Sequence, residues 1–145
     1  MFGFGKKRKE QQKRVEAVKH RVDLCYSFLV AETVALTPIR LIKPEFNQRD
    51  SLKLFLFVDA AIHTLIGDLL TDDELDTFLF KNIFSASGVF KDFVFYVSPD
   101  SRQLINEALK ENDTELFDVV EAAESAVAAL VDGDYAPGKL RACLR

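Results

Sequence analysis

The sequence has no tryptophan, and its single methionine is the first residue. Thirteen of its 145 residues are phenylalanine, so the interior is expected to consist of Phe, Leu, Val and Ala. Cys25 and Cys143 are too few for a disulfide framework, which favours a reducing compartment. Cys25 lies on an apolar helical stripe, where we expect a small buried hydrophobic residue, whereas Cys143 lies near the end of the sequence.

Long uninterrupted apolar runs are also missing. The two most apolar stretches are broken by charge, the first at Asp23 and Glu32 and the second at Asp59 and Asp68. Neither reaches the roughly eighteen clean apolar residues that are typical of a membrane span. The basic N-terminal residues are not followed by the apolar stretch and cleavage site of a signal peptide. We therefore expect a cytoplasmic protein.

Known catalytic signatures are absent as well. The sequence contains no glycine-rich phosphate loop, no Gly-x-Ser-x-Gly elbow and no Cys-x-x-Cys pair. Hydrophobic residues make up 48% of the chain and charged residues 29%, which is typical of a globular domain and excludes a disordered chain. The sequence predicts no cofactor.

Positive charge is concentrated at the N-terminus. The first 21 residues hold eight cations against two acids, a charge of +6, while the other 124 hold 11 cations against 21 acids, a charge of −10. Such a division favours an arm that binds an anionic surface or the acidic body of a second copy. The candidate anion-binding residues are Lys6, Lys7, Arg8, Lys9, Lys13 and Arg14.

Three interpretations of this arm remain open. It could be a solvated tail, or it could contact an anionic membrane, with Phe2 and Phe4 inserting beside the cations. It could also contact nucleic-acid phosphates, which Lys and Arg bind without reading sequence. No zinc-finger or aromatic RNA-binding motif supports the last possibility.

Hydrophobic periodicity predicts a long first helix over residues 6–36. Its stripe repeats at spacings of three and four and is broken only at Glu32. Thr37-Pro38 is expected to end it, with residues 39–47 as a connector. At 31 residues the helix would be about 46 Å long and would overhang a compact domain. We therefore divide the chain into an overhanging basic end, residues 1–14, and a single helical domain, residues 15–145.

The remaining segments also predict helices. Residues 48–70 are apolar on almost all sides, as in a central helix, and Thr71 with Glu74 forms a capping box for a helix from residue 72 to about 85. Residues 89–97 fit a helix or a strand, and we predict a helix. Further helices are expected over 98–111 and 114–131, the second capped by Asp113 or Thr114 and ended by Gly133, with a closing turn over 139–144. The sum is an all-α, single-domain bundle of five or six helices with a long N-terminal helix.

One polar group lies where a core is expected. Asp59 and His63 are one turn apart inside the apolar arc of the second helix, and Glu32 is a possible third member from the first helix. Buried carboxylate and imidazole groups can bind a metal, act as an acid–base pair or hydrogen-bond each other. The Glu-x-x-His pattern of di-iron bundles is not present. We expect Asp59 and His63 to be buried and hydrogen-bonded.

The stretch from position 78 to position 96 is rich in aromatic residues. We expect them either to fill the core or to form an interaction surface. The seven residues are Phe78, Phe80, Phe84, Phe90, Phe93, Phe95 and Tyr96.

These features favour a non-enzymatic helical interaction or regulatory module that self-associates. In such a dimer each basic arm would lie along acidic residues near or on the partner's last long helix: Glu111, Glu115, Asp118, Glu121 and Glu124. The alternatives are a metal-dependent or acid–base enzyme centred on Asp59, His63 and Glu32, and a peripheral binder of anionic membrane or nucleic acid.

Overall fold

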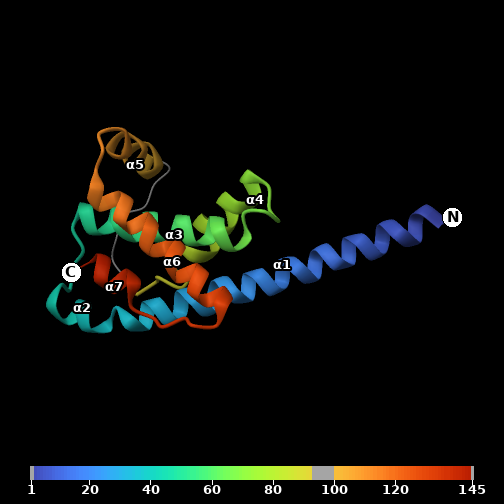
Figure 1. The fold of residues 1–145 in the computed structure, drawn as a ribbon, viewed down its shortest axis with the longest axis horizontal. Helices are drawn as coiled ribbons and strands as arrows, with labels where there is room; N and C mark the ends of the chain where they lie inside the picture. The colour runs from blue at the N-terminus through green and yellow to red at the C-terminus, as the bar shows by residue number, and fades with distance from the viewer. Residues whose placement is uncertain (1, 93–99, 145) are drawn as a thin grey trace.

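The computed structural model describes residues 2–92 and 100–144, and their regular structure is entirely helical. The elements in chain order are α1 (Phe2–Ala35), α2 (Thr37–Ile42), α3 (Gln48–Ile66), α4 (Asp72–Thr77), the π-helix η1 (Phe78–Ile83), α5 (Asp100–Lys110), α6 (Thr114–Asp132) and α7 (Lys139–Cys143). They form one helical bundle from which the first turns of α1 project (Figure 1). The predicted all-α class with a long N-terminal helix is confirmed.

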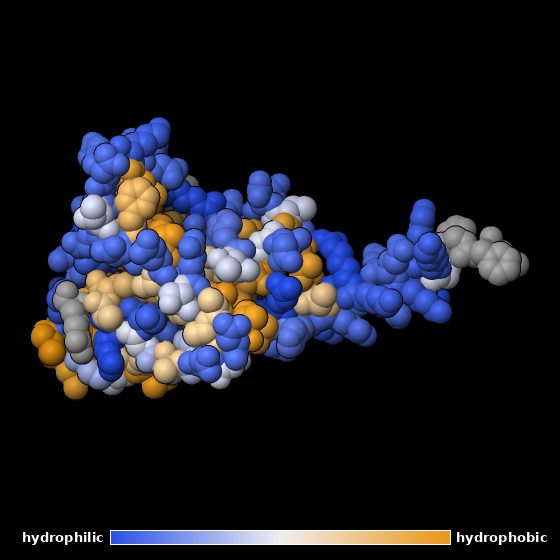
Figure 2. Space-filling model, in the orientation of Figure 1, coloured by the Kyte–Doolittle hydropathy of each residue, from blue (hydrophilic) through white to orange (hydrophobic). Residues whose placement is uncertain are grey.

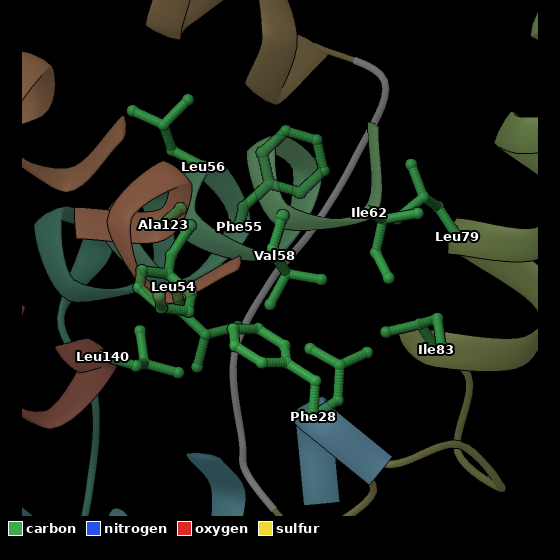
Figure 3. Close-up of a cluster of buried hydrophobic side chains, with 14 of the residues drawn as sticks. Phe28, Leu54, Phe55, Leu56, Val58, Ile62, Leu79, Ile83, Ala123 and Leu140 are labelled. Carbon is green, nitrogen blue, oxygen red and sulfur yellow. The ribbon is translucent and has the colours of Figure 1, made fainter. Parts of the chain in front are cut away.

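The central helix of the bundle is α3. Residues 53–58 are buried on every side because α1, α5, α6 and α7 all pack against this helix. Figure 3 shows its side chains meeting Phe28 of α1, Leu79 and Ile83 of η1, and Ala123 of α6 in a single core. The central position predicted from its all-round apolar character is confirmed.

The second half of α1 packs on this core through a buried stripe. Cys25 and Leu29 are fully buried, as the periodicity predicted, and so is Phe28, which lies outside the predicted stripe. The helix ends at Ala35, close to the predicted stop before Pro38. The segment expected as a connector contains α2, however, because a proline that cannot continue one helix suits the first turn of the next.

The chain from Asp72 changes helical type after two turns. Thr71 caps α4 through the predicted box: its hydroxyl accepts from the Glu74 N–H at 3.2 Å, and the Glu74 carboxylate accepts from the Thr71 N–H at 3.0 Å. From Phe78 onward the helix widens into η1, where the Phe84 N–H donates to the Leu79 carbonyl, five residues earlier, at 2.9 Å. The wider turn was not predicted.

A tight turn at Gly88 follows η1. A Cβ atom here would meet the carbonyl oxygens of Asn82 and Ile83, so only glycine fits without a shift of the backbone. Residues 89–92 form turns instead of the predicted helix, because the chain folds back on η1 at Gly88. Positions 93–97, where helix and strand were both considered, and the predicted cap at Ser98-Pro99 lie outside the described residues.

The last helices begin and end at predicted signals. The Asp113 carboxylate accepts from the Leu116 N–H at 3.2 Å and caps α6, and Gly133 ends α6 in the left-handed conformation with φ of 83°. The predicted closing turn is α7, whose Leu140 side chain is fully buried in the core. The C-terminal segment is therefore part of the bundle.

Candidate functional site

The first turns of α1 project from the bundle as a separate helical rod (Figure 1). We call residues 5–13 the basic arm. All of its side chains are exposed, and five cations against Glu10 give it a charge of +4. Figure 2 shows that the surface of the projecting arm is hydrophilic. Within the described part of the chain, no side chain of the arm forms a hydrogen bond or an ion pair with the bundle.

The arm is anchored by two arginines at its base. Arg14 donates to the Leu69 carbonyl oxygen at 3.2 Å, and Arg21 donates to the Leu65 carbonyl oxygen at 2.7 Å. Arg14 also lies 3.5 Å from the Glu74 carboxylate. Cations are favourable beside the free carbonyls at the C-terminal end of a helix such as α3. Arg14, which the sequence placed among the anion-binding residues, therefore contacts the bundle and marks where the free arm ends.

Negative charge is concentrated on α6. This helix carries five acids and no cation: Glu115, Asp118, Glu121, Glu124 and Asp132. Lys53 and Arg49 pair with Glu115, and the hydrogen bond from Lys53 lowers the pKa of that carboxyl despite partial desolvation. Asp118, Glu121 and Glu124 are exposed along the outer side of the helix. The molecule therefore presents a basic helix and an acidic helical face.

A charged cluster that the sequence did not reveal joins α3 to α6 and to the C-terminal segment. Arg49 pairs with Asp113 at 2.7 Å, and this hydrogen bond lowers the pKa of the Asp113 carboxyl. Lys53, which is buried, donates to the Cys143 carbonyl oxygen at 3.1 Å. These contacts connect positions 64 and 90 residues apart, which local sequence patterns cannot detect.

Glu32 is fully buried, and it ties α1 to the C-terminal segment. Its carboxylate accepts from the Tyr135 hydroxyl at 2.7 Å and from the Gly138 and Leu140 N–H groups at 3.3 Å each. Burial, together with the hydrogen bond to Glu32 and its charge, raises the pKa of Tyr135 well above its ordinary value. The carboxylate has three donors, so its burial is compensated by hydrogen bonds.

Asp59 and His63 belong to another charged cluster, which lies near the protein surface and does not include Glu32. The His63 Nδ1–H donates to the Asp59 carbonyl oxygen at 2.7 Å, and the same nitrogen lies 3.5 Å from the Asp59 carboxylate. Arg102 of α5 pairs with Asp59 at 3.1 Å and with Asp76 at 2.6 Å, and its guanidinium carbon lies 5.8 Å from the centre of the Phe80 ring. Desolvation opposes the charge of Arg102, but Asp59 and Asp76 together raise its pKa. This cluster holds α5 against α3 and α4.

The expectation that both members of the pair are buried is wrong for His63, whose side chain is 47% exposed, while that of Asp59 is 19% exposed. A helical wheel gives the direction in which a side chain points but does not show whether another helix covers it. Arg102 of α5 contacts Asp59, whereas His63, one turn further along α3, is left exposed. Glu32 shares no hydrogen-bond partner with the pair. Among the described residues, no three His, Cys, Asp or Glu side chains form a group that could hold a metal ion.

Most of the described aromatic stretch belongs to the core. Phe55 of α3 stacks on Phe80 and packs against Phe84, which stacks in turn on the buried Phe90. Phe93, Phe95 and Tyr96 lie outside the described residues.

Apolar surface remains on the outer side of α1 and α2. Val30 and Val34 line a groove of about 420 Å³ together with Lys81 and Lys91. Leu41 and Ile42, at the end of α2, are 84% and 79% exposed. By length and composition alone, the helical stretch from residue 5 to residue 42 could cross a membrane, a test that core helices of soluble proteins and signal sequences also pass.

Comparisons of the chain with protein-family models, with curated proteins and with solved structures found no match. The function is therefore inferred from the geometry of the chain itself.

Proposed function

We propose that this chain is a non-enzymatic helical interaction module whose binding element is the basic arm. The observation that carries the proposal is the arm's isolation: nine residues with a charge of +4 extend from the bundle without an acidic partner among the described residues. Arg14 and Arg21 fix the base of the helix, so the arm has a defined direction. It is thus presented in a form suited to binding an anionic surface.

The stability of the arm supports a binding role. The arm extends α1 beyond its last contacts with the bundle, so no tertiary packing stabilises these turns, and the like charges of Lys9 and Lys13, one turn apart, repel each other. An anionic partner would remove the repulsion and order the segment. Binding through the arm should therefore stabilise α1 and weaken with added salt.

The enzyme alternative gains no support from the described geometry. Glu32 holds the C-terminal segment, whereas Asp59 holds α5 through Arg102, so the three candidate residues serve two separate structural clusters. His63 is the only exposed member, and its ring nitrogen Nδ1 is engaged by the Asp59 carbonyl oxygen.

A second candidate function is binding to an anionic membrane surface. The exposed apolar pair Leu41 and Ile42 favours it, because these side chains could enter the interface while the arm contacts lipid headgroups. Each arm cation near such a surface would contribute about 1 kcal/mol.

Neutralising the arm tests the proposal. The test variant replaces its five cations, Lys6, Lys7, Arg8, Lys9 and Lys13, with glutamine, and the control variant replaces Lys81, Lys91 and Lys110, which are exposed on the bundle. Self-association by light scattering, sedimentation with phosphatidylserine vesicles and anisotropy with duplex DNA are measured at low and high salt. We expect at least one salt-sensitive association that the test variant loses and the control retains. Identical behaviour of the two variants in all three assays would overturn the proposal.

A further inference from the structure

The outer side of α6 forms a stripe suited to packing against another helix. Its members follow one another at alternating spacings of four and three, which places them along one line of the helix surface. They are Phe117, Glu121, Glu124, Ala128 and Val131, all exposed. The stripe is apolar at both ends and acidic or small in the middle, so a second helix could lie close along it.

The basic arm complements this face in charge and geometry. Lys6, Lys9 and Lys13 fall on one side of the arm at spacings of three and four, and the outer side of α6 offers the exposed acids Asp118, Glu121 and Glu124. The arm is about 14 Å long and α6 about 28 Å, so the arm fits within the length of the acidic face.

The two surfaces do not meet within one chain. Figure 1 shows the arm pointing away from the bundle that contains α6. Within the part of the chain that the structure describes, no ion pair joins the arm to Asp118, Glu121 or Glu124. Both surfaces are therefore left free for an intermolecular contact.

We propose that the partner of the basic arm is a second copy of this chain, and that the arm of each copy lies along the exposed face of α6 in the other. This inference rests on the proposed function and names its partner. A two-fold axis makes both contacts identical, so the pair closes as a dimer with no unused arm. The ion pairs of this contact are exposed, so the association should weaken with added salt.

A charge-swap experiment tests the contact. One variant reverses the arm, with Lys6→Glu, Lys9→Glu and Lys13→Glu; the other reverses the α6 face, with Asp118→Lys, Glu121→Lys and Glu124→Lys. In sedimentation equilibrium at low salt, each variant alone should associate roughly tenfold or more weakly than the unmodified chain. An equimolar mixture should restore association, because each arm then meets a face of opposite charge.

A control separates this pairing from a general effect of charge. Lys91→Glu and Glu45→Lys reverse exposed charges away from both surfaces and should leave association unchanged, and circular dichroism confirms that every variant keeps its helices. A wild-type chain that stays monomeric, or a mixture that fails to associate, overturns the inference. In that case the variant with a neutralised arm separates the two proposals. If that variant loses vesicle or DNA binding, the proposed function stands and only the partner is wrong. If it does not, both proposals fail.

Discussion

At the scale of single residues, the buried carboxylate of Glu32 is the contact on which the C-terminal segment depends. Replacing it with alanine leaves the Tyr135 hydroxyl and two backbone N–H groups without their acceptor. Each buried unsatisfied group costs about 1–3 kcal/mol. We expect Glu32→Ala to lower the free energy of unfolding by roughly 3–5 kcal/mol, measured by urea denaturation.

Two variants calibrate this measurement. Tyr135→Phe removes a single hydrogen bond to the carboxylate and should cost about 1.5–3 kcal/mol. Glu16→Ala changes an exposed carboxylate on the same helix and should stay within about 0.5 kcal/mol of wild type. If Glu32→Ala were no worse than Glu16→Ala, the carboxylate would not hold the segment in solution.

The two cysteines should differ sharply in reactivity. Burial raises the pKa of Cys25 to about 12, although the charge of Arg21 partly opposes the shift, and the side chain is fully buried. Cys143 is half-buried, and burial raises its pKa as well. At pH 8 a disulfide reagent should label only Cys143 in the folded protein and both thiols in urea. A Cys143→Ser variant that still reacts when folded would contradict the buried position of Cys25.

At the scale of elements, the capping box at the start of α4 makes a prediction with a pH dependence. Thr71→Ala should destabilise the protein by about 1 kcal/mol at neutral pH. The backbone N–H and hydroxyl of Thr71 lower the pKa of Glu74, so the stability that this carboxylate contributes is present above its ordinary pKa and is lost as the pH falls through the lowered value.

The penalty of Thr71→Ala should therefore be smaller at pH 3 than at pH 7. Thermal unfolding at both pH values measures it, with Thr64→Ala as the control because that exposed hydroxyl donates to the Ala60 carbonyl inside α3 and is not part of a cap. A penalty that is equal at both pH values would show that the Thr71 hydroxyl does not interact with the Glu74 carboxylate, since the backbone N–H of residue 71 remains in the alanine variant.

Elements that depend on neighbouring residues were predictable, and those that depend on distant ones were not. Thr71 and Gly133 were identified, and Asp113 was one of two candidate caps, because a cap or a left-handed terminator involves residues within one turn. The widening of the helix at Phe78 was missed, since no capping or terminating residue in the sequence marks it. The exposure of His63 was missed for a similar reason, because the reach of α5 along α3 is not encoded near His63 itself.

At the scale of the whole molecule, the sequence predicted the class of fold and the separation of charge, but not the contacts that join the ends of the chain. An uneven charge distribution and a periodic apolar pattern are visible in the sequence itself, without knowledge of any tertiary contact. The basic arm and the all-α bundle were therefore both expected. The partners of Glu32 are 103 to 108 residues away, and only folding brings them together. A candidate site assembled from Asp59, His63 and Glu32 therefore combined residues that face different neighbours.

The hydrogen bonds of Glu32 also set the order in which this protein can mature on the ribosome. α1 is synthesised first, but the Glu32 carboxylate has no hydrogen-bond donors until residues 135–140 have emerged. At about 5–20 residues per second, that delay lasts roughly 5–20 s. Throughout it, the apolar stripe of α1 and the basic arm are displayed together on an unfinished chain, so nascent copies are most open to chaperones and to premature pairing in this interval.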